Sequence, residues 1–338
     1  MPKLLVISLN YRTPAMTLRS VQHALREMQG LEAELVIVDN DSGDGSFEAM
    51  HAALASEPWA AGAPVRLIQS GHNGGFGAGN NVGICAGWSD GSRPDYIYLL
   101  NSDAFPGPDS LRALLRHLET HPEAGLAGSY IHGEDGAPHY SAFRFPSALS
   151  ELEAAARFGP VTRLLNAHRV WLDLPERALP VDWLAGASLM MRQSVLDEIG
   201  LFDETYFLYF EETDLCLRAA RAGYETHYVR DSEVVHIGSV STGMKTWARV
   251  PGFWLDSRWH YYSKNHGRPY AVAVTLAHLA GGLIWRLRRV LQRKPKADPD
   301  RFLRDLLLHD IRAMTRPLPG QRGAQPRPGC RTPEANPE

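Results

Sequence analysis

The sequence predicts an α/β fold in which a mostly parallel sheet is flanked by helices. The N-terminal half alternates short apolar runs of β type with helical patterns, and this alternation is typical of a parallel sheet covered by helices. Polar loops follow the apolar runs, as in open α/β sheets that bind ligands beyond the carboxyl ends of their strands. A chain of 338 residues with 44% hydrophobic residues is long and apolar enough to bury such a core.

The elements of this half follow one another in a regular order. Strands are expected at residues 4–9, 34–38, 65–69, 96–100 and 125–131. Helices are expected at 14–28, at 47–55, from a glycine-rich loop to residue 88, and at 108–118. The first helix has the clearest start, because Pro14 suits the first helical position and Thr13 precedes it as an N-cap.

The second half is expected to complete the sheet and to cover it. Residues 137–180 mix aromatic residues, proline and arginine, and we interpret them as an excursion over the site that meets the second substrate. A helix that begins near Glu211 is expected beyond one that ends at residue 199. Strands are expected at 181–184, 189–192, 225–229 and 233–236.

The C-terminal part changes character from residue 247 onward. Aromatic and basic residues at 259–267 precede an apolar stripe at helical spacing, formed by Val272, Leu276, Leu279, Leu283, Leu287 and Val290. Basic residues gather at the end of this stripe. The apolar run 269–285 is marginal for a membrane span of about 20 residues. Two interpretations of the helix at 269–293 stay open: it lies on an anionic membrane surface, or it packs on the catalytic domain. Residues 318–338 are expected to be disordered.

Composition excludes some classes of function. A net charge of −3 argues against nucleic acid as the main partner, because no basic majority meets the phosphates. Three cysteines lie far apart, which predicts neither a disulfide framework nor a zinc motif and favours the reducing cytoplasm. We also expect no signal peptide, since the apolar start is short and lacks a cleavage site.

The stretch from Gly200 to Leu215 carries the strongest chemical signal. An aromatic, apolar run delivers three carboxylates, Glu211, Glu212 and Asp214, to the start of a helix. Apolar walls raise the pKa of a carboxylate and exclude water, which favours proton transfer. The structural alternative is that acidic residues complement the positive end of the helix dipole.

Helix geometry separates these carboxylates. Glu211, Asp214 and Arg218 fall on one face at steps of three and four residues, so Asp214 and Arg218 are expected to form a surface ion pair. Glu212 points about 100° away from that face, given the helical period. We therefore predict that Glu212 is the reactive acid and that Asp214 is mainly structural.

The glycine-rich loop 73–81 follows the third strand. Its glycines do not fit the spacing of a dinucleotide-binding fingerprint, and the first strand leads into Asn10 and Tyr11 without any glycine. One interpretation is a close approach of the backbone to phosphate at a helix start. The other, which a lone glycine-rich loop favours, is a tight connection from strand to helix.

The sequence Asn101-Ser102-Asp103 after the fourth strand suits the end of a metal–diphosphate site. A hard cation takes one or two carboxylates and fills its other positions with phosphate and water. An Asx-turn before the next helix is the structural alternative. His236 becomes a strong candidate for a cation ligand only if Asp103 holds a cation. At Gly186, close approach of a sugar ring and close packing against a strand are equally good interpretations.

Together these motifs resemble the inverting glycosyltransferases of family 2, most closely their bacterial rhamnosyltransferase-like branch. The resemblance extends from Leu5 to about Gly267. Besides the acidic stretch and the loop after His236, it rests on Val6-Ile7-Ser8-Leu9-Asn10-Tyr11, Val36-Ile37-Val38-Asp39-Asn40-Asp41-Ser42, Asn73-Gly74-Gly75-Phe76-Gly77-Ala78-Gly79-Asn80-Asn81, Leu100-Asn101-Ser102-Asp103 and Trp183-Leu184-Ala185-Gly186-Ala187. The resemblance implies the GT-A fold, a nucleotide-sugar donor and a divalent cation, Mg²⁺ or Mn²⁺.

The resemblance also implies residue roles. Asp39 would contact the nucleoside, and Asp103 with His236 would hold the cation. Glu212 stands where the family usually has the Asp of a Glu-Asp pair, its general base, and this departure adds one methylene; Glu211 and Asp214 would support it. The implied nucleotide-sugar site comprises Asn10, Tyr11, Asp39, Asn73, Gly74, Gly75, Asn101, Ser102 and Gly186.

The implied organisation is a catalytic domain at 1–246, with a nucleotide-sugar half at about 1–131 and an acceptor half at about 132–246, followed by a helical extension at 247–317. The implied reaction is transfer of L-rhamnose from dTDP-L-rhamnose to a glycan or lipid-linked glycan of the cell envelope, at the cytoplasmic face of the inner membrane. A UDP-hexose or UDP-galactofuranose donor is the alternative within the fold. A sugar-nucleotide-binding or scaffold protein without activity is the alternative outside enzymes.

Overall fold

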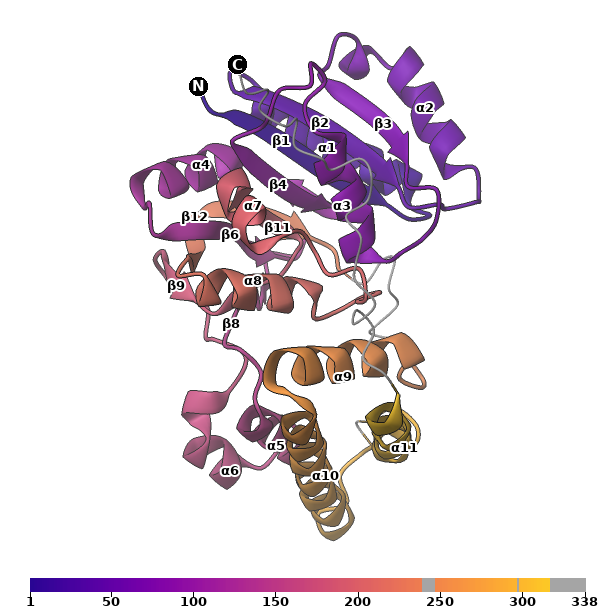
Figure 1. Cartoon of the computed structure of the whole chain (residues 1–338), viewed down its shortest axis with the longest axis vertical. Coiled ribbons are helices and arrows are strands. Elements are labelled where there is room, and N and C mark those ends of the chain that lie inside the picture. Colours follow the sequence, from indigo (N-terminus) through magenta and orange to yellow (C-terminus); the bar gives the residue numbers. More distant parts are fainter. Residues whose placement is uncertain (239–246, 297, 317–338) are drawn as a thin grey trace, which may run out of the picture.

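The computed structural model describes residues 1–238, 247–296 and 298–316. Strands and helices alternate through the first 132 residues, as expected, except that a short strand at 104–106 follows the fourth strand without a helix between them (Figure 1). In this half the strands are β1 (Lys3–Asn10), β2 (Glu32–Asp39), β3 (Val65–Gln69), β4 (Tyr96–Asn101), β5 (Ala104–Pro106) and β6 (Ala124–His132). The helices are α1 (Pro14–Met28), α2 (Ser46–Ser56), α3 (Phe76–Ala86) and α4 (Ser110–Thr120).

The rest of the chain completes the sheet and adds a layer of helices. Its strands are β7 (Pro138–His139), β8 (Ala142–Phe143), β9 (Leu179–Val181), β10 (Trp183–Leu184), β11 (Ser188–Arg192) and β12 (Glu225–His236). Its helices are α5 (Ala148–Ala156), α6 (Gly159–Leu164), α7 (Gln193–Ile199), α8 (Glu211–Arg221), α9 (Gly252–His266), α10 (Arg268–Leu291) and α11 (Phe302–Thr315). The two short strands expected at 225–236 form one strand, whose pairing with β6 shifts between Val229 and Glu233.

The main sheet is mixed rather than all parallel. Its strand order is β3-β2-β1-β4-β11-β6-β12-β5. The strands β3, β2, β1 and β4 are parallel, and β12 is parallel to β6. Strand β11 is antiparallel to both of its neighbours, β4 and β6. The α/β class is confirmed, and β11 brings the segment before it back to the edge at which β4 ends.

Both faces of the sheet are buried, which explains the continuous apolar runs of its strands. Successive residues of a strand point to opposite faces, so Leu4 and Val6 of β1 join one core cluster and Leu5 and Ile7 join the other. Helices α1 and α4 cover the first face; α3, α7 and α8 cover the second. This double cover leaves the strand ends as the place for polar chemistry.

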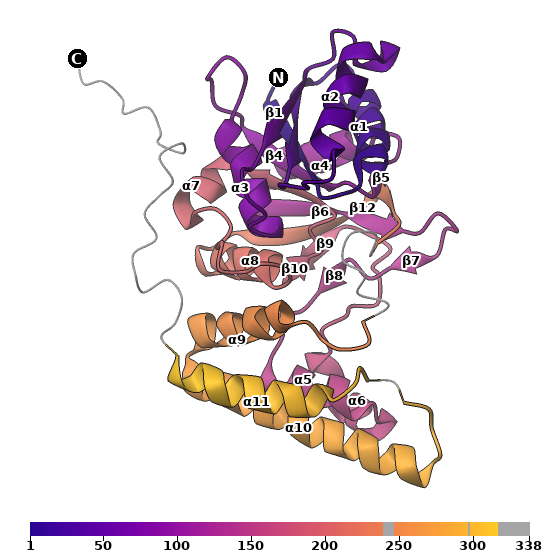
Figure 2. The ribbon, with the colours of Figure 1, turned by 90° about the vertical axis from the view of Figure 1, so that its right-hand side faces the viewer.

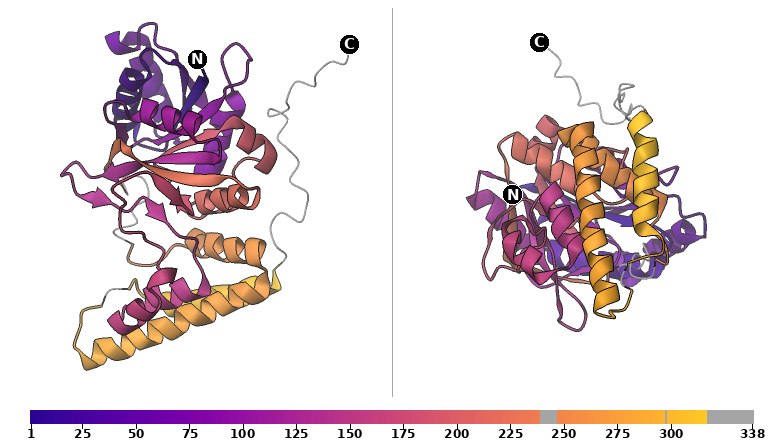
Figure 3. Two further views of the ribbon diagram at one scale, coloured as in Figure 1. Left: turned by 90° about the vertical axis from the view of Figure 1, so that its left-hand side faces the viewer. Right: turned by 90° about the horizontal axis from the view of Figure 1, so that it is seen from below.

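The C-terminal helices form a layer below the sheet domain, where α10 and α11 lie side by side (Figures 2 and 3). Helix α5 belongs to this layer, although residues 137–180 were expected to cover the site. It packs closely on α10. Leu152 of α5 lies so near Gly281 of α10 that a Cβ at residue 281 would be only 2.5 Å from the Leu152 carbonyl oxygen. Only the ends of the segment, with β7 and β9, pair with the main sheet.

A buried polar network ties the layer together. Arg258 of α9 is 1% exposed, and it donates to Glu151 of α5 at 3.1 Å and to Asp310 of α11 at 3.3 Å. His278 of α10 contacts the second oxygen of Glu151 at 2.5 Å. The inner face of α10 therefore packs on protein, which is one of the two interpretations left open for this helix. Its outer face is exposed.

Candidate active site

The loop after β2 is organised by a buried carboxylate. Asp39 is 0% exposed and accepts hydrogen bonds from Asn10 Nδ2 at 2.6 Å, Ser42 Oγ at 2.6 Å and the Ser42 amide at 3.1 Å. These bonds join the ends of β1 and β2. Asp39 thus shapes the loop, and the half-buried Tyr11 follows Asn10 at the end of β1.

The glycine-rich loop is a tight connection from strand to helix. Asn73 Oδ1 accepts from the Gly75 amide at 3.0 Å and from Asn40 Nδ2 at 3.0 Å. Gly75 has φ +91°, and a Cβ there would lie 1.7 Å from the carbonyl oxygen of Phe207. That carbonyl accepts a hydrogen bond from the Phe76 amide at 3.0 Å. Glycine at 75 therefore lets the acidic loop 201–210 dock directly on the glycine-rich loop.

Two further features hold the acidic loop in place. The Asn81 side chain of α3 accepts from the Phe202 amide at 3.1 Å and donates to the Phe202 carbonyl at 2.9 Å. Tyr209 and Phe210 have φ of +71° and +72°, a region that bulky residues rarely adopt. Such strain persists where the surroundings enforce it. Here it turns the chain sharply into α8.

Helix α8 begins with the two glutamates, and the structure separates their surroundings. Glu211 is 1% exposed, and its Oε2 has no hydrogen-bond partner among the described residues. Burial raises the pKa of Glu211 well above its usual value, and the neighbouring Glu212 raises it further. Glu212 is half-buried, and its Oε1 lies 3.4 Å from the amide nitrogen of Gly186. Burial also raises the pKa of Glu212.

Gly186 lies in a narrow space beside Glu212. A Cβ there would come within 3.0 Å of the Phe76 ring and 3.3 Å of Glu212 Oε1. Residue 186 therefore packs against the glycine-rich loop and the carboxylate at once, and any larger side chain would displace one of them.

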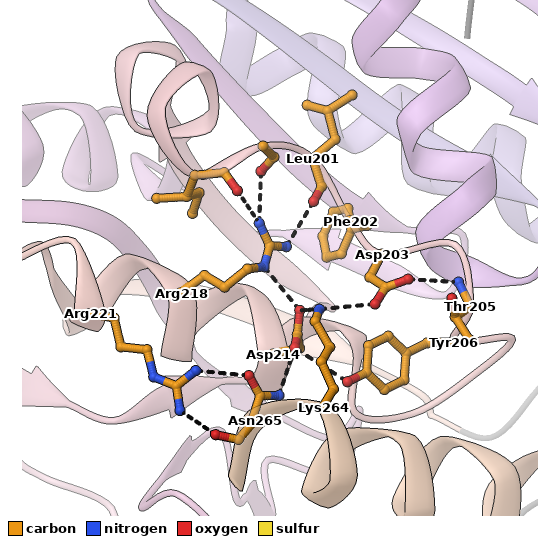
Figure 4. Close-up of polar contacts among 12 residues, drawn as sticks. Leu201, Phe202, Asp203, Thr205, Tyr206, Asp214, Arg218, Arg221, Lys264 and Asn265 are labelled. Carbon is orange, nitrogen blue, oxygen red and sulfur yellow. Dashed lines mark hydrogen bonds and ion pairs between the residues drawn. The ribbon is translucent and has the colours of Figure 1, made fainter. Parts of the chain in front are cut away.

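Asp214 and Arg218 form the expected ion pair, but its expected position at the surface is wrong, because the Asp214 side chain is 0% exposed. Its oxygens accept from Arg218 Nε at 2.9 Å, Lys264 Nζ at 2.8 Å and Asn265 Nδ2 at 2.8 Å (Figure 4). Burial alone would raise the pKa of Asp214, but the charges of Lys264 and Arg218 lower it below its usual value. The pair is buried because α9 packs over α8, a contact between distant parts of the chain. The expectation that Asp214 is structural agrees with these contacts.

The turn after β4 brings two candidate cation ligands together. His236 Nε2 lies 3.1 Å from Asp103 Oδ1, and the Ile237 amide donates to the Asp103 carbonyl at 3.1 Å. Burial alone would raise the pKa of Asp103, but the hydrogen bond and charge of His236 lower it. A carboxylate kept ionised beside an imidazole suits Mn²⁺ or Mg²⁺ completed by phosphate and water oxygens. The loop 239–241 that follows lies outside the described residues.

The Asp103 turn and Glu212 flank the same short segment. In the β4–β11 pair Ser188 lies opposite Leu100, and the Asn101 amide donates to the Ala187 carbonyl at 3.1 Å. Gly186 immediately precedes Ala187, and Asp103 follows Asn101 by two residues, so both lie close in the chain to this hydrogen bond. Glu212 contacts Gly186 from α8. The candidate base and the candidate cation ligands thus lie at one edge of the sheet.

Some residues of the site were not found from the sequence. The ring of His139 lies 6.5 Å from that of His236, in a segment without a recognisable pattern. Lys264 and His260 of α9 both contact Asp203 of the acidic loop at 2.9 Å. Asn40 and Asn81 belong to motifs already noted. Asn40 is marked only as an asparagine at the end of a strand, and Asn81, inside α3, has no separate signal.

Comparison with known proteins identifies the family. A family model described as glycosyltransferase like family 2 matches residues 2–260. N-acetylglucosaminyl-diphospho-decaprenol L-rhamnosyltransferase of Mycobacterium tuberculosis is 36% identical over 220 residues, which cover 62% of this chain and 68% of that protein. Rhamnosyltransferase WbbL of Escherichia coli is 32% identical over 48% of this chain and 60% of its own length.

Solved structures share the fold at low sequence identity. A mannosyltransferase from Pyrobaculum calidifontis, solved with GDP-Man and Mn²⁺, has a TM-score of 0.54 and 14% identity, covering 92% of this chain and 80% of its own. GalNAc-T7 with UDP, GalNAc and Mn²⁺ also has a TM-score of 0.54 and 14% identity, covering 94% and 59%. The expected GT-A fold is thereby confirmed. Because the family match spans residues 2–260, which include the whole main sheet and the candidate residues at its edge, the chain belongs to glycosyltransferase family 2, is similar to its rhamnosyltransferases, and is a transferase.

Proposed function

We propose that the enzyme transfers L-rhamnose from dTDP-L-rhamnose, with inversion, to a lipid-linked glycan acceptor. The names of the two rhamnosyltransferase relatives support the sugar, and one of them names a diphospho-decaprenol acceptor. The observation that carries the proposal is that the Gly186 segment, which Glu212 contacts, leads into the strand beside β4, whose following turn carries Asp103 in contact with His236.

Glu212 acts as the general base. It accepts the proton of an acceptor hydroxyl while that oxygen bonds to the anomeric carbon of the donor sugar. The bond from this carbon to the diphosphate oxygen breaks, and its electron pair leaves with the nucleoside diphosphate. A raised pKa suits a base that works near neutral pH, and a positioned base contributes on the order of 10²–10⁴-fold to the rate. Burial and the neighbouring Glu212 raise the pKa of Glu211 well above its usual value, which favours its neutral form and leaves Glu212 as the member of the pair that ionises.

Asp103 and His236 would hold the divalent cation, because they are the carboxylate and the imidazole that meet at this edge. When bound, a cation of this kind neutralises the charge that grows on the departing diphosphate. The nucleoside lies at the ends of β1, β2 and β3, where Tyr11 offers its ring and Asp39 positions the loop through Asn10. The proposed nucleotide-binding surface is completed by Asn101, Ser102, Asn73 and Gly74.

The lipid part of the acceptor fits the outer face of the C-terminal layer. Exposed apolar residues form a stripe on α10, among them Leu276 at 59%, Leu283 at 62% and Leu287 at 63% exposure. Leu308, Ile311 and Met314 of α11 are exposed at 41%, 52% and 45%. The basic residues at the end of α10 are Arg286, Arg288, Arg289, Arg293, Lys294 and Lys296.

These features suit a bilayer with anionic headgroups, on which apolar side chains insert and basic ones meet the charge. Helix α10 has 24 residues and contains an 18-residue window with a mean hydropathy of 1.3, so it is long and apolar enough to span a membrane by length and composition alone. We favour surface binding, because Thr275 and His278 on its inner face bond to the buried Asp310 and Glu151.

The test compares sugar transfer by the parent and by Glu212→Gln, with Glu48→Gln on the exposed side of α2 as a matched control. We expect Glu212→Gln to lower the turnover number at least about 100-fold while dTDP binding, measured by calorimetry with Mn²⁺, stays within a factor of about 3. Transfer by Glu212→Gln at the parent rate would refute the base. Turnover of UDP-sugars in preference to dTDP-rhamnose would refute the donor, and metal-dependent binding without turnover of any donor would indicate a protein without activity.

A further inference from the structure

A second group of metal-ligating side chains lies at the other end of the strands, where β6 and β12 begin. Glu123 immediately precedes β6, and Glu225 is the first residue of β12. The ligand atoms of Glu123, Glu225 and His227 all lie within 4.8 Å of one another. His236 lies at the far end of β12, so the two groups are separated by on the order of 30 Å, given the rise of a strand.

The fold brings these three side chains together for local reasons. The Glu225 amide donates to the Glu123 carbonyl at 2.9 Å, which sets the first rung between the two parallel strands. Residues 225 and 227 are two apart in one strand, so their side chains share a face. His227 is 4% exposed, whereas both glutamates are exposed. The imidazole of this group is therefore buried, and its two carboxylates are exposed to solvent.

The ring of His227 is oriented through Nδ1, the ring nitrogen that does not contact Glu225. His227 Nε2 lies 2.8 Å from Glu225 Oε2, and its Nδ1 lies 2.8 Å from Nε2 of His117 in α4. His121 stacks on His117 with ring centroids 4.1 Å apart. A ligating histidine in proteins is usually held by a hydrogen bond to its other ring nitrogen, and this bond fixes the tautomer and the orientation. His117 is in the position to do this for His227.

The charges favour a cation. Two carboxylates side by side repel each other unless a positive charge lies between them. Among residues 1–238, 247–296 and 298–316, no lysine or arginine lies within 4.0 Å of either glutamate, and His227 is the partner of Glu225. Strand β12 also contacts α4 here (Figure 1), and a cation at this point would join the beginnings of β6 and β12.

We propose that Glu123, Glu225 and His227 form a structural site for a transition-metal dication, best represented by Zn²⁺. One imidazole nitrogen and two carboxylate oxygens are ligands that Zn²⁺ accepts, and water completes a four-coordinate site. The ion binds Nε2 of His227 and leaves the ring proton on Nδ1, facing His117. It fastens the first residues of β6 to those of β12 and takes no part in sugar transfer.

The experiment titrates Zn²⁺ into the full chain carrying Asp103→Asn, which removes the carboxylate of the other cation site. We expect about one Zn²⁺ per chain by calorimetry and a higher thermal midpoint with Zn²⁺ than without it. Adding Glu123→Gln and Glu225→Gln, both at exposed positions, should weaken binding at least about 10-fold and abolish the thermal shift. Glu48→Gln in the same background is the matched control and should change neither.

Two results would overturn the proposal: no Zn²⁺ binding by the Asp103→Asn chain, or equal binding after both glutamates are replaced. The thermal midpoint without metal shows whether the double variant is folded. In the chain with Asp103 intact, the double glutamine variant should transfer sugar with Mn²⁺ at the parent rate. This separates the structural site from the proposed function.

Discussion

Lys264 of α9 donates to the buried Asp214 of α8 at 2.8 Å, and the same ammonium group donates to Asp203 at 2.9 Å. One side chain of the C-terminal layer thus holds both the helix that carries Glu212 and the loop that leads to it. Helix α9 therefore supports the candidate active site.

Replacing Lys264 by Met should destabilise the protein by about 2–3 kcal/mol, because Asp214 loses a charged hydrogen-bond donor while it stays buried. Urea denaturation measures this. Lys294→Met, at an exposed position after α10, should change stability by less than about 0.5 kcal/mol. Equal stabilities of the two variants would show that the contact of Lys264 with Asp214 contributes nothing.

The pH dependence of the reaction should report Glu212. Its pKa is raised above the ordinary value of 4.5 by burial, and a base must be ionised to accept a proton. The rate should therefore fall as the pH decreases through the raised pKa, so the acidic limb of kcat/KM lies above pH 4.5. A limb at or below 4.5 would contradict this assignment.

Glu211→Gln should distinguish the two glutamates. Burial and the neighbouring Glu212 raise the pKa of Glu211 well above 4.5, which favours its neutral form, and glutamine resembles that form. The variant should keep its rate within about 10-fold of the parent, in contrast to Glu212→Gln. For stability the sign follows from the raised folded pKa: the contribution of Glu211 is present below pH 4.5 and is lost as the pH rises through that pKa. Unfolding of the parent and of Glu211→Gln across this range measures it.

Gly75→Ala should impair the site far more than Gly71→Ala. Both glycines have positive φ, +91° and +79°, but a Cβ at 75 would meet the Phe207 carbonyl whereas a Cβ at 71 has nothing within 4 Å. Backbone strain alone costs about 1–2 kcal/mol in each variant. The clash at residue 75 should also lower donor affinity at least about 10-fold. Calorimetric dTDP binding by the two variants tests this, and equal affinities would refute it.

Membrane binding should depend on the outer stripe of α10. Leu283→Ser with Leu287→Ser should reduce co-sedimentation with phosphatidylglycerol vesicles at least about 10-fold, because two exposed apolar side chains no longer insert. Ala52→Ser with Ala55→Ser, exposed on α2, is the matched control. Neutral phosphatidylcholine vesicles should bind the parent more weakly. A dimer in solution that the leucine variants abolish, without vesicle binding, would mean that a second copy covers this face.

Most of the sheet domain could be predicted from the sequence. The bounds of α1 and β3 are those expected, and the other expected elements of the first half differ by a few residues at their ends. Local patterns suffice there, because apolar runs and helical periods are properties of neighbouring residues. The antiparallel direction of β11 has no local signal, since direction depends on where the chain enters the sheet.

Residues of the candidate site that belong to sequence motifs could be predicted. Residues whose burial or contacts depend on tertiary packing could not. Asp103 and His236 were paired through a family resemblance and lie 3.1 Å apart. Asp214 was expected at the surface because its helix alone places it there, and α9 buries it. Lys264 had no signal, since 50 residues separate it from Asp214. Periodicity describes an element, whereas burial depends on what packs over it.

The Phe207 carbonyl that fills the space beside Gly75 has a kinetic consequence. A nucleotide that binds the glycine-rich loop should also order the loop that precedes Glu212, because the Phe76 amide donates a hydrogen bond to the Phe207 carbonyl at 3.0 Å. We expect compulsory order, with the donor entering first and the nucleoside diphosphate leaving last. Product inhibition by dTDP should then be competitive with the donor and non-competitive with the acceptor.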